Sequence, residues 1–127
     1  DYLKGQLKEL QAKYPNIIKE IRGRGLMVGI EFNDFSQTLP IGLNQIVSVL
    51  DEKLKGSMCG FIGCLLLAEH NILVAFTEYN RNVIRLEPPL IIQKEHIDML
   101  TKALDDLPLC ASLNPEKYLF FYFYLLL

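Results

Sequence analysis

The stretch IRGRGLMVGIEF, residues 21–32, decides the fold. Over residues 26–32 every second side chain is large and apolar, which is the period of a strand with one buried face. Residues 17–22 predict a strand before it, and Gly23 and Gly25 can adopt the positive φ angles of a tight connection. We therefore expect a β-hairpin at this point of the chain.

Helices flank this hairpin in the sequence. An apolar stripe over residues 3–14 predicts a helix that ends before Pro15, and apolar residues at i, i+3, i+4 and i+7 predict another over residues 43–54. Residues 58–68 are apolar nearly all round, which is typical of either a buried helix or an irregular apolar segment. Asn71 fits the left-handed residue that follows many helices.

A second hairpin follows. Residues 72–76 and 83–86 are rich in β-forming residues and are separated by a polar turn, and Pro88-Pro89 ends the ladder. Residues 94–107 carry apolar residues at helical spacing and predict the last helix. Two hairpins and three or four helices, without a βαβ alternation, predict an α+β domain in which the helices pack on an antiparallel sheet.

Composition narrows the classes of function. With 127 residues, the chain has the size of one domain. Charged residues make up 22% of it and the formal net charge is -2, so the chain lacks the excess of positive charge that a surface for binding nucleic-acid phosphates needs. Arg22 and Arg24 lack repeats and interleaved aromatic residues, so we expect no nucleic-acid binding.

The apolar run Tyr118–Leu127 is about half the ~20 residues of a membrane-spanning helix, so we expect no membrane span. An odd number of cysteines without metal-ligand spacing favours a reducing, cytoplasmic compartment.

Arg85 is the candidate binding residue. It lies in the predicted strand 83–86, where alternation places it on the face opposite to its two apolar neighbours. A guanidinium matches a carboxylate bidentately, and a charge-assisted hydrogen bond of this kind contributes roughly 1.5–3 kcal/mol. The sequence leaves open the alternatives of an ion pair with Glu87 or Glu31, or of simple exposure.

Other reactive side chains give weaker indications. Cys59 and Cys64 have a C-x4-C spacing with no second pair, so we expect small buried cysteines and no metal site. His70 lies at a predicted helix end, and His96 lies in the first turn of the last helix, where a lone imidazole is usually solvated. We expect neither histidine to be catalytic.

Several segments together resemble the C-terminal part of class III aminotransferases, the pyridoxal-phosphate family of acetylornithine, ornithine, putrescine and 4-aminobutyrate transaminases. The segments are Tyr14-Pro15, residues 21–32, residues 72–74, VIRLEPPL at residues 83–90 and the closing helix 95–107. The resemblance covers about residues 3–107. It implies the smaller α+β domain of a larger enzyme.

The resemblance also implies a role for Arg85, because in this family the arginine of the strand before the Pro-Pro pair commonly binds a substrate carboxylate. The implied enzyme is a pyridoxal-phosphate transaminase that acts on an amino acid or ω-amine and a 2-oxo acid, with active sites built at a dimer interface. In the family the glycine-rich hairpin is mainly structural. Since it joins two strands and does not open a helix, we expect no phosphate binding there.

The family's Schiff-base lysine, the acidic partner of the pyridine nitrogen and the phosphate cup lie upstream, in the large domain. None of the nine lysines here stands in that context: Lys4, Lys8, Lys13, Lys19, Lys53, Lys55, Lys94, Lys102 and Lys117. We therefore expect residues 1–107 to be a small domain that neither binds the cofactor nor transaminates alone, followed by an atypical apolar tail, residues 108–127.

The chain begins with Asp1 and not Met, so we expect a fragment or a processed product whose partners are the large domain and a second subunit. The alternative is non-enzymatic: a stand-alone α+β module that binds a small carboxylate through Arg85 or associates with itself through the apolar tail.

Overall fold

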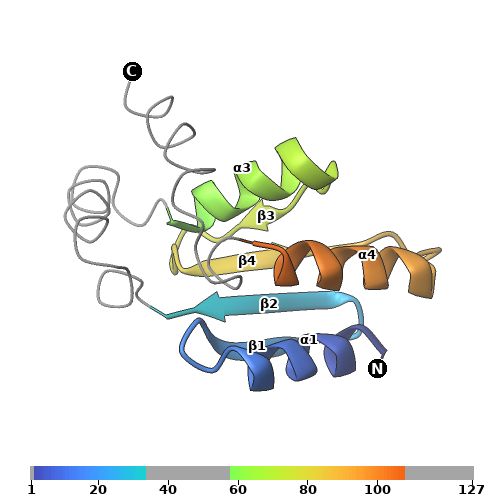
Figure 1. Cartoon of the computed structure of the whole chain (residues 1–127), viewed down its shortest axis with the longest axis horizontal. Coiled ribbons are helices and arrows are strands. Elements are labelled where there is room, and N and C mark those ends of the chain that lie inside the picture. Colours follow the sequence, from blue (N-terminus) through green and yellow to red (C-terminus); the bar gives the residue numbers. More distant parts are fainter. Residues whose placement is uncertain (1, 34–57, 108–127) are drawn as a thin grey trace.

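The computed structural model describes residues 2–33 and 58–107 of the chain. These residues form a sheet with helices on one of its faces (Figure 1). In chain order the elements are α1 (Tyr2–Lys13), β1 (Ile18–Arg24), β2 (Met27–Phe32), α3 (Met58–His70), β3 (Ala75–Phe76), β4 (Val83–Leu86) and α4 (Lys94–Asp105).

The sheet has four strands in the order β1-β2-β4-β3, and every neighbouring pair is antiparallel. It therefore consists of two hairpins placed side by side through β2 and β4. In the first hairpin, Arg24 faces Met27 and the turn between them starts at Gly25, which has a φ of 60°. A glycine with positive φ at this position is typical of the tight two-residue turns that join twisted strands. The predicted hairpins and the α+β class are confirmed.

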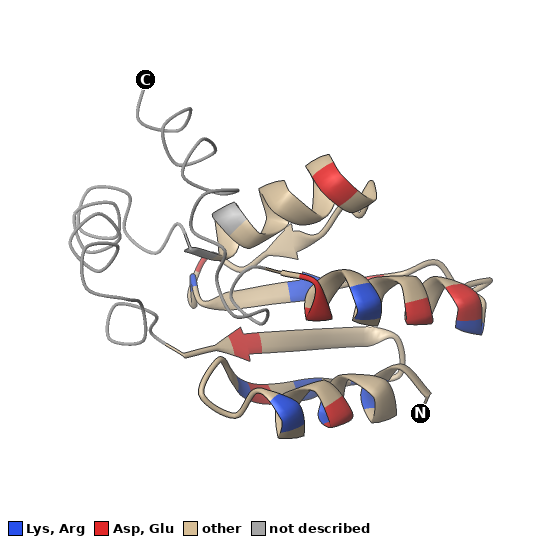
Figure 2. Ribbon diagram, in the orientation of Figure 1, with Lys and Arg blue, Asp and Glu red and all other residues tan. Residues whose placement is uncertain are grey.

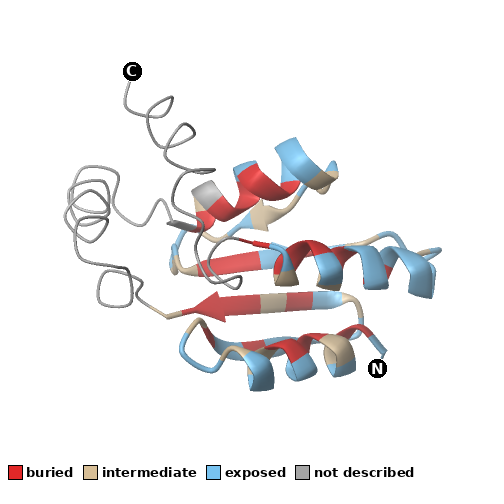
Figure 3. Cartoon of the chain, viewed as in Figure 1, coloured by how far each residue is buried: buried red, intermediate tan, exposed pale blue. Residues whose placement is uncertain are grey.

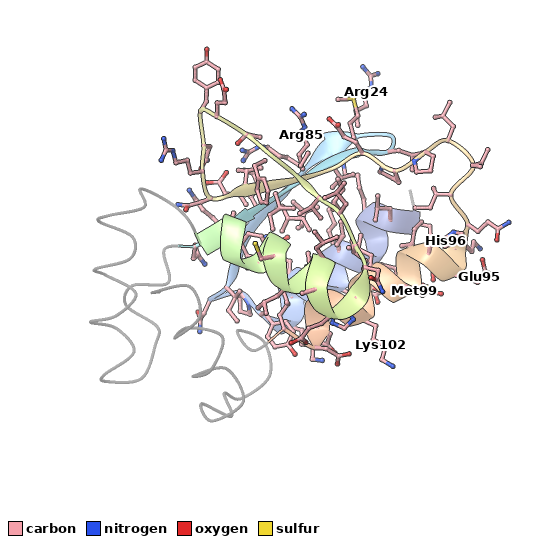
Figure 4. The ribbon with its side chains drawn as sticks, turned by 90° about the horizontal axis from the view of Figure 1, so that it is seen from above. Arg24, Arg85, Glu95, His96, Met99 and Lys102 are labelled. Carbon is pink, nitrogen blue, oxygen red and sulfur yellow. The ribbon has the colours of Figure 1, made fainter. Side chains whose placement is uncertain are left out.

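The core lies between the sheet and the helices, where the buried residues gather (Figure 3). Seen from above, α1, α3 and α4 lie on the same side of the sheet (Figure 4). The helices contribute apolar residues at helical spacing, and the strands contribute one face each, so that burial of these side chains stabilises both layers. The core includes Leu3, Leu7 and Leu10 of α1, Ile62, Leu65 and Leu66 of α3, Ile97, Leu100 and Leu104 of α4, and Val28, Ile30, Ile84 and Leu86 of the sheet.

The apolar segment after residue 57 is helical, which decides between the two alternatives that the sequence left open. The helix ends at His70, and the next residue, Asn71, has a φ of 56°, which confirms the predicted left-handed residue. The strand predicted over residues 72–76 is wrong in length, because the strand comprises Ala75–Phe76 alone. The reason is the helix end: the N–H of Ile72 donates to the carbonyl of Leu66 at 3.0 Å and is not available to the sheet.

Polar contacts join α1 to α4, and both helices carry acidic and basic residues (Figure 2). At one end, Lys13 Nζ lies 2.6 Å from Asp105 Oδ1, and the Tyr14 hydroxyl donates to the same carboxylate at 2.7 Å. The hydrogen bond from Lys13, followed by that from Tyr14, lowers the pKa of Asp105. At the other end, the Tyr2 hydroxyl donates to Asp98 at 2.6 Å.

Two sequence-based expectations fall on other parts of the chain. The helix predicted over residues 43–54 and the apolar run 118–127 lie outside the described residues. Within residues 2–33 and 58–107, none of the helices combines the length and the apolarity needed to cross a bilayer.

Candidate functional site

Arg85 lies on the face of the sheet opposite to the described helices α1, α3 and α4, here termed the open face. The flanking residues Ile84 and Leu86 are buried and Arg85 is exposed, as strand alternation predicts. Figure 4 shows its side chain projecting on the side away from the helices. Directly beside it on the two neighbouring strands are Gly29 of β2 and Ala75 of β3. Because both neighbours are small, the guanidinium is not flanked by bulky side chains.

The guanidinium of Arg85 is paired with Glu87. Nε of Arg85 lies 2.7 Å from Oε1 of Glu87, and the two side chains are 45% and 40% exposed. Glu87 precedes Pro88, which disfavours helical backbone at the residue before it, so the chain stays extended and Glu87 remains on the same face as Arg85. Of the alternatives that the sequence left open, the ion pair with Glu87 is therefore present. Glu31 has other partners.

Glu31 is the buried charge of this face, at 7% exposed. Lys19 Nζ lies 2.7 Å from Oε1 of Glu31, and Arg22 Nη1 bonds both to Oε2 of Glu31 and to Glu20. The hydrogen bonds from Lys19 and then Arg22 lower the pKa of Glu31 to about 2. Arg22 is thus neutralised by two carboxylates.

The burial of Glu31 is a feature that the sequence analysis missed. Alternation places this residue on the solvent face, and it is the two long cationic side chains of β1 that cover it. The signal in the sequence is the set of opposite charges on facing strands, Lys19 and Arg22 against Glu31.

Arg24, at the end of the first hairpin, is a second exposed guanidinium on this side (Figure 4). Within the described part of the chain, the side chain of Arg24 makes no hydrogen bond or ion pair. Arg24 is therefore a suitable control for the general effect of an exposed positive charge.

The two described cysteines differ in burial. Cys59 is 1% exposed, and burial raises the pKa of its thiol to about 12. Cys64 is exposed, so its predicted burial is wrong. Five residues of an α-helix amount to about 1.4 turns, so the two side chains leave α3 in different directions. Cys110 lies outside the described residues.

Within residues 2–33 and 58–107, neither histidine side chain is hydrogen-bonded to a Ser, Thr or Cys side chain. His96 is exposed, as predicted, and Nδ1 of its ring accepts the backbone N–H of Gln93 at 3.3 Å. It thereby satisfies a donor at the start of α4. His70 is half-buried at the end of α3. Within the described ranges, no group of three or more His, Cys, Asp or Glu side chains is arranged to hold a metal ion.

A cavity of about 470 Å³ opens beside Glu87, between the chain that follows α3 and the N-terminal half of α4. Apolar side chains form most of its wall, and its polar lining residues are His70, Asn71, Glu87 and His96. Figure 4 shows His96 and Met99 of the cavity wall on α4, away from Arg85. Arg85 does not line this cavity, whereas its partner Glu87 does.

Comparisons with known proteins identify the family of the chain. The family model described as aminotransferase class-III matches residues 1–107. The chain belongs to the class III aminotransferases. Among the relatives of this class III aminotransferase chain, mitochondrial ornithine aminotransferase of Arabidopsis thaliana is 33% identical over 120 residues, which cover 91% of this chain and 21% of the relative.

Two further matches extend the comparison of this class III aminotransferase chain. Aminotransferase PigE of Serratia sp. is 30% identical over 129 residues, which cover 80% of this chain and 15% of PigE. The solved M. tuberculosis protein Rv3290C superposes with a TM-score of 0.62 at 22% identity, over 87% of this chain and 20% of that one, which shows the shared fold. The chain therefore spans 15–21% of the length of these relatives.

The described lysines of this class III aminotransferase chain do not fit the role of an amine that holds pyridoxal phosphate. Such an amine needs a lowered pKa, through burial or neighbouring cations. Here the Lys13 pKa is raised by its bond to Asp105, and Lys19 is paired with Glu31. Lys4 donates to a backbone carbonyl, and Lys8, Lys94 and Lys102 are exposed.

Proposed function

We propose that residues 1–107 are the C-terminal small domain of a pyridoxal-phosphate transaminase that acts on an amino acid or ω-amine and a 2-oxo acid. In this proposal, Arg85 binds a substrate carboxylate, and residues 108–127 are an atypical addition to the domain. The supporting observation is the placement of Arg85: its half-exposed guanidinium stands on the open face of the sheet, on a strand within the region that the family model matches.

The geometry around Arg85 suits a carboxylate. The contact with Glu87 engages Nε, and the terminal nitrogens of the guanidinium form a fork that can donate two parallel hydrogen bonds to one carboxylate. Gly29 and Ala75 on either side leave room for the ligand. The strand is held by its neighbours on both sides, so the guanidinium starts from a fixed backbone position and less conformational entropy is lost on binding.

Pyridoxal phosphate, which the family implies for the intact enzyme, supplies the electron sink for amino transfer. Since the described lysines do not fit as its anchor, we place that anchor in the large domain of the proposed cytoplasmic enzyme. The small domain then contributes Arg85, which orients the substrate by its carboxylate while the partner domain holds the cofactor. The proposed partners are this large domain and a second subunit.

A titration of the 127-residue chain with pentanoate tests the role of Arg85. A bidentate carboxylate contact worth roughly 1.5–3 kcal/mol corresponds to a Kd of about 10–100 mM, which two-dimensional NMR detects through the amide signals of Gly29 and Ala75. We expect Arg85→Ala to abolish these shift changes. Arg24→Ala, which removes an exposed arginine from the same side of the molecule, should leave them intact. Equal binding by wild type and Arg85→Ala would remove the proposed role.

Trapping of lysine adducts tests the proposal that the lysine that anchors pyridoxal phosphate lies in the large domain and not in this chain. We expect borohydride reduction in the presence of pyridoxal phosphate to label the lysines sparsely and without preference, because the described lysines are exposed or bonded to carboxylate and carbonyl oxygens. Mass spectrometry of the digested chain locates the label. Stoichiometric labelling of a single lysine would show that this chain anchors the cofactor by itself.

A further inference from the structure

The first turn of α4 is bonded in both directions to the residue that precedes the helix. Nδ1 of His96 accepts the backbone N–H of Gln93 at 3.3 Å, and the carbonyl of Gln93 accepts the backbone N–H of His96 at 3.2 Å. We propose that His96 is a pH-dependent cap, which holds the start of α4 in place while its ring is neutral and releases it when the ring takes up a proton. This inference is independent of the carboxylate role of Arg85.

The cap depends on the protonation state of one ring nitrogen. A backbone N–H needs an acceptor, so Nδ1 of His96 carries a lone pair and the neutral ring has its proton on Nε2. An imidazolium ring carries a proton on both nitrogens and can only donate, so the Gln93 N–H loses its acceptor when the ring is protonated. Protonation also places a positive charge in the first turn of a helix, where the helix dipole disfavours cations. Both effects favour an open first turn in acid.

The residue type at this position makes the cap sensitive to pH near neutrality. His96 stands three residues after the N-cap Gln93, where a capping box usually has glutamate or glutamine. The side-chain oxygens of those residues accept a backbone N–H at neutral and mildly acidic pH, whereas an imidazole side chain becomes protonated between about pH 8 and pH 5. The cap is therefore present at the upper end of this range and lost at the lower end.

Ionisable groups surround His96 on its own helix and on three neighbouring elements. They are Lys94, Glu95 and Asp98 of α4, Tyr2 of α1, His70 at the end of α3 and Glu87 after β4. Nearby carboxylates attract a protonated ring, but an ion pair does not supply the acceptor that the Gln93 N–H has lost. Among these groups, His70 shares the titration range of His96, and lysine, tyrosine and carboxyl side chains keep one charge state between about pH 5 and pH 8.

Loss of the cap loosens one wall of the cavity of about 470 Å³. Residues 87–93 join β4 to α4, and four of them line the cavity beside His96 (Figure 4): Glu87, Pro88, Pro89 and Ile92. In the middle of this segment, Leu90 and Ile91 are 92% and 85% exposed, so these two side chains do not anchor it in the core. The contact with His96 ties the end of the segment to α4, and protonation of the ring removes this tie.

Amide hydrogen exchange of the full chain at pH 8 and pH 5 tests the cap. The backbone N–H of Ile97, which donates to the carbonyl of Gln93 at 3.4 Å, reports the first turn, and its protection is expressed relative to the intrinsic exchange rate at each pH. We expect this protection to fall about two- to tenfold at pH 5, the range that corresponds to one hydrogen bond. The NMR signal of the Gln93 amide proton should move upfield over the pH interval in which the His96 ring titrates.

Two histidine variants decide which imidazole is responsible. His96→Gln keeps an acceptor at the same position at every pH, so the protection of Ile97 should be equal at both pH values. His70→Gln removes the other imidazole that lines the cavity and should leave the fall unchanged. Equal protection of the wild type at pH 8 and pH 5, a fall of the same size in His96→Gln, or loss of the fall in His70→Gln would each refute the proposed cap.

Discussion

Replacing Glu31 by Gln should destabilise the fold by about 1–2 kcal/mol at pH 7. The carboxylate lies on β2 at 7% exposed and accepts hydrogen bonds from Lys19 and Arg22, which lower its pKa from 4.5 to about 2. At about 1.4 kcal/mol per pKa unit, this fall in pKa sets an upper limit of about 3 kcal/mol on the contribution of the Glu31 carboxylate to the free energy of unfolding. The two cations are 59% and 44% exposed, so solvent screening reduces the contribution to about half.

The pH dependence follows from the direction of the shift. Because the pKa of Glu31 is lower in the folded state, its stabilisation is fully present above pH 4.5 and is lost as the pH falls toward about 2. The difference in unfolding free energy between wild type and Glu31→Gln should therefore be constant from pH 7 to pH 5 and shrink below that.

Urea unfolding of the full chain, followed by circular dichroism at several pH values, measures the difference between wild type and Glu31→Gln. Glu20→Gln is the matched control: Glu20 is 55% exposed and bonds to Arg22 alone, so a change of less than about 0.5 kcal/mol is expected. Equal stability of Glu31→Gln and wild type at pH 7, or a difference that persists at pH 2, would refute the reasoning.

Three further predictions concern the fold and the thiols. Gly23→Ala should destabilise by about 1–3 kcal/mol in urea unfolding, because φ is 141° and a Cβ would clash with a backbone carbonyl of the facing strand. Leu7→Ala should cost about 2–5 kcal/mol, since this side chain is 0% exposed, and an unchanged urea midpoint would contradict its core position. In a Cys110→Ser background, iodoacetamide should alkylate exposed Cys64 within minutes and spare Cys59, whose thiol pKa is about 12; equal rates by mass spectrometry would contradict this.

The fold was predictable where local pattern and tertiary packing agree. Residues 21–32 combine strand alternation with glycines at the turn, and the structure has both the paired strands and the positive φ angles of these glycines. The predicted strand over residues 72–76 is too long because the amide of Ile72 donates to the carbonyl of Leu66 in α3. That contact depends on the geometry of the helix end. The predicted burial of Cys64 is wrong because a helix that is apolar nearly all round does not show in its sequence which side faces solvent.

The site was predictable in part. Alternation placed Arg85 on the open face, and the neighbouring Glu87 was among its named partners. The burial of Glu31 depends on how the long side chains of β1 lie across β2, and strand register, which a single sequence leaves undetermined, decides that contact. The interaction of His96 with the start of α4 likewise needs the position of the Gln93 amide.

The role of Arg85 is tested most directly by a crystal structure of the chain with pentanoate. If Arg85 binds carboxylates, both carboxylate oxygens should lie about 2.7–2.9 Å from its guanidinium, on the open face of the sheet between Gly29 and Ala75. A carboxylate bound at another place, with Arg85 still paired to Glu87 and free of ligand, would contradict it.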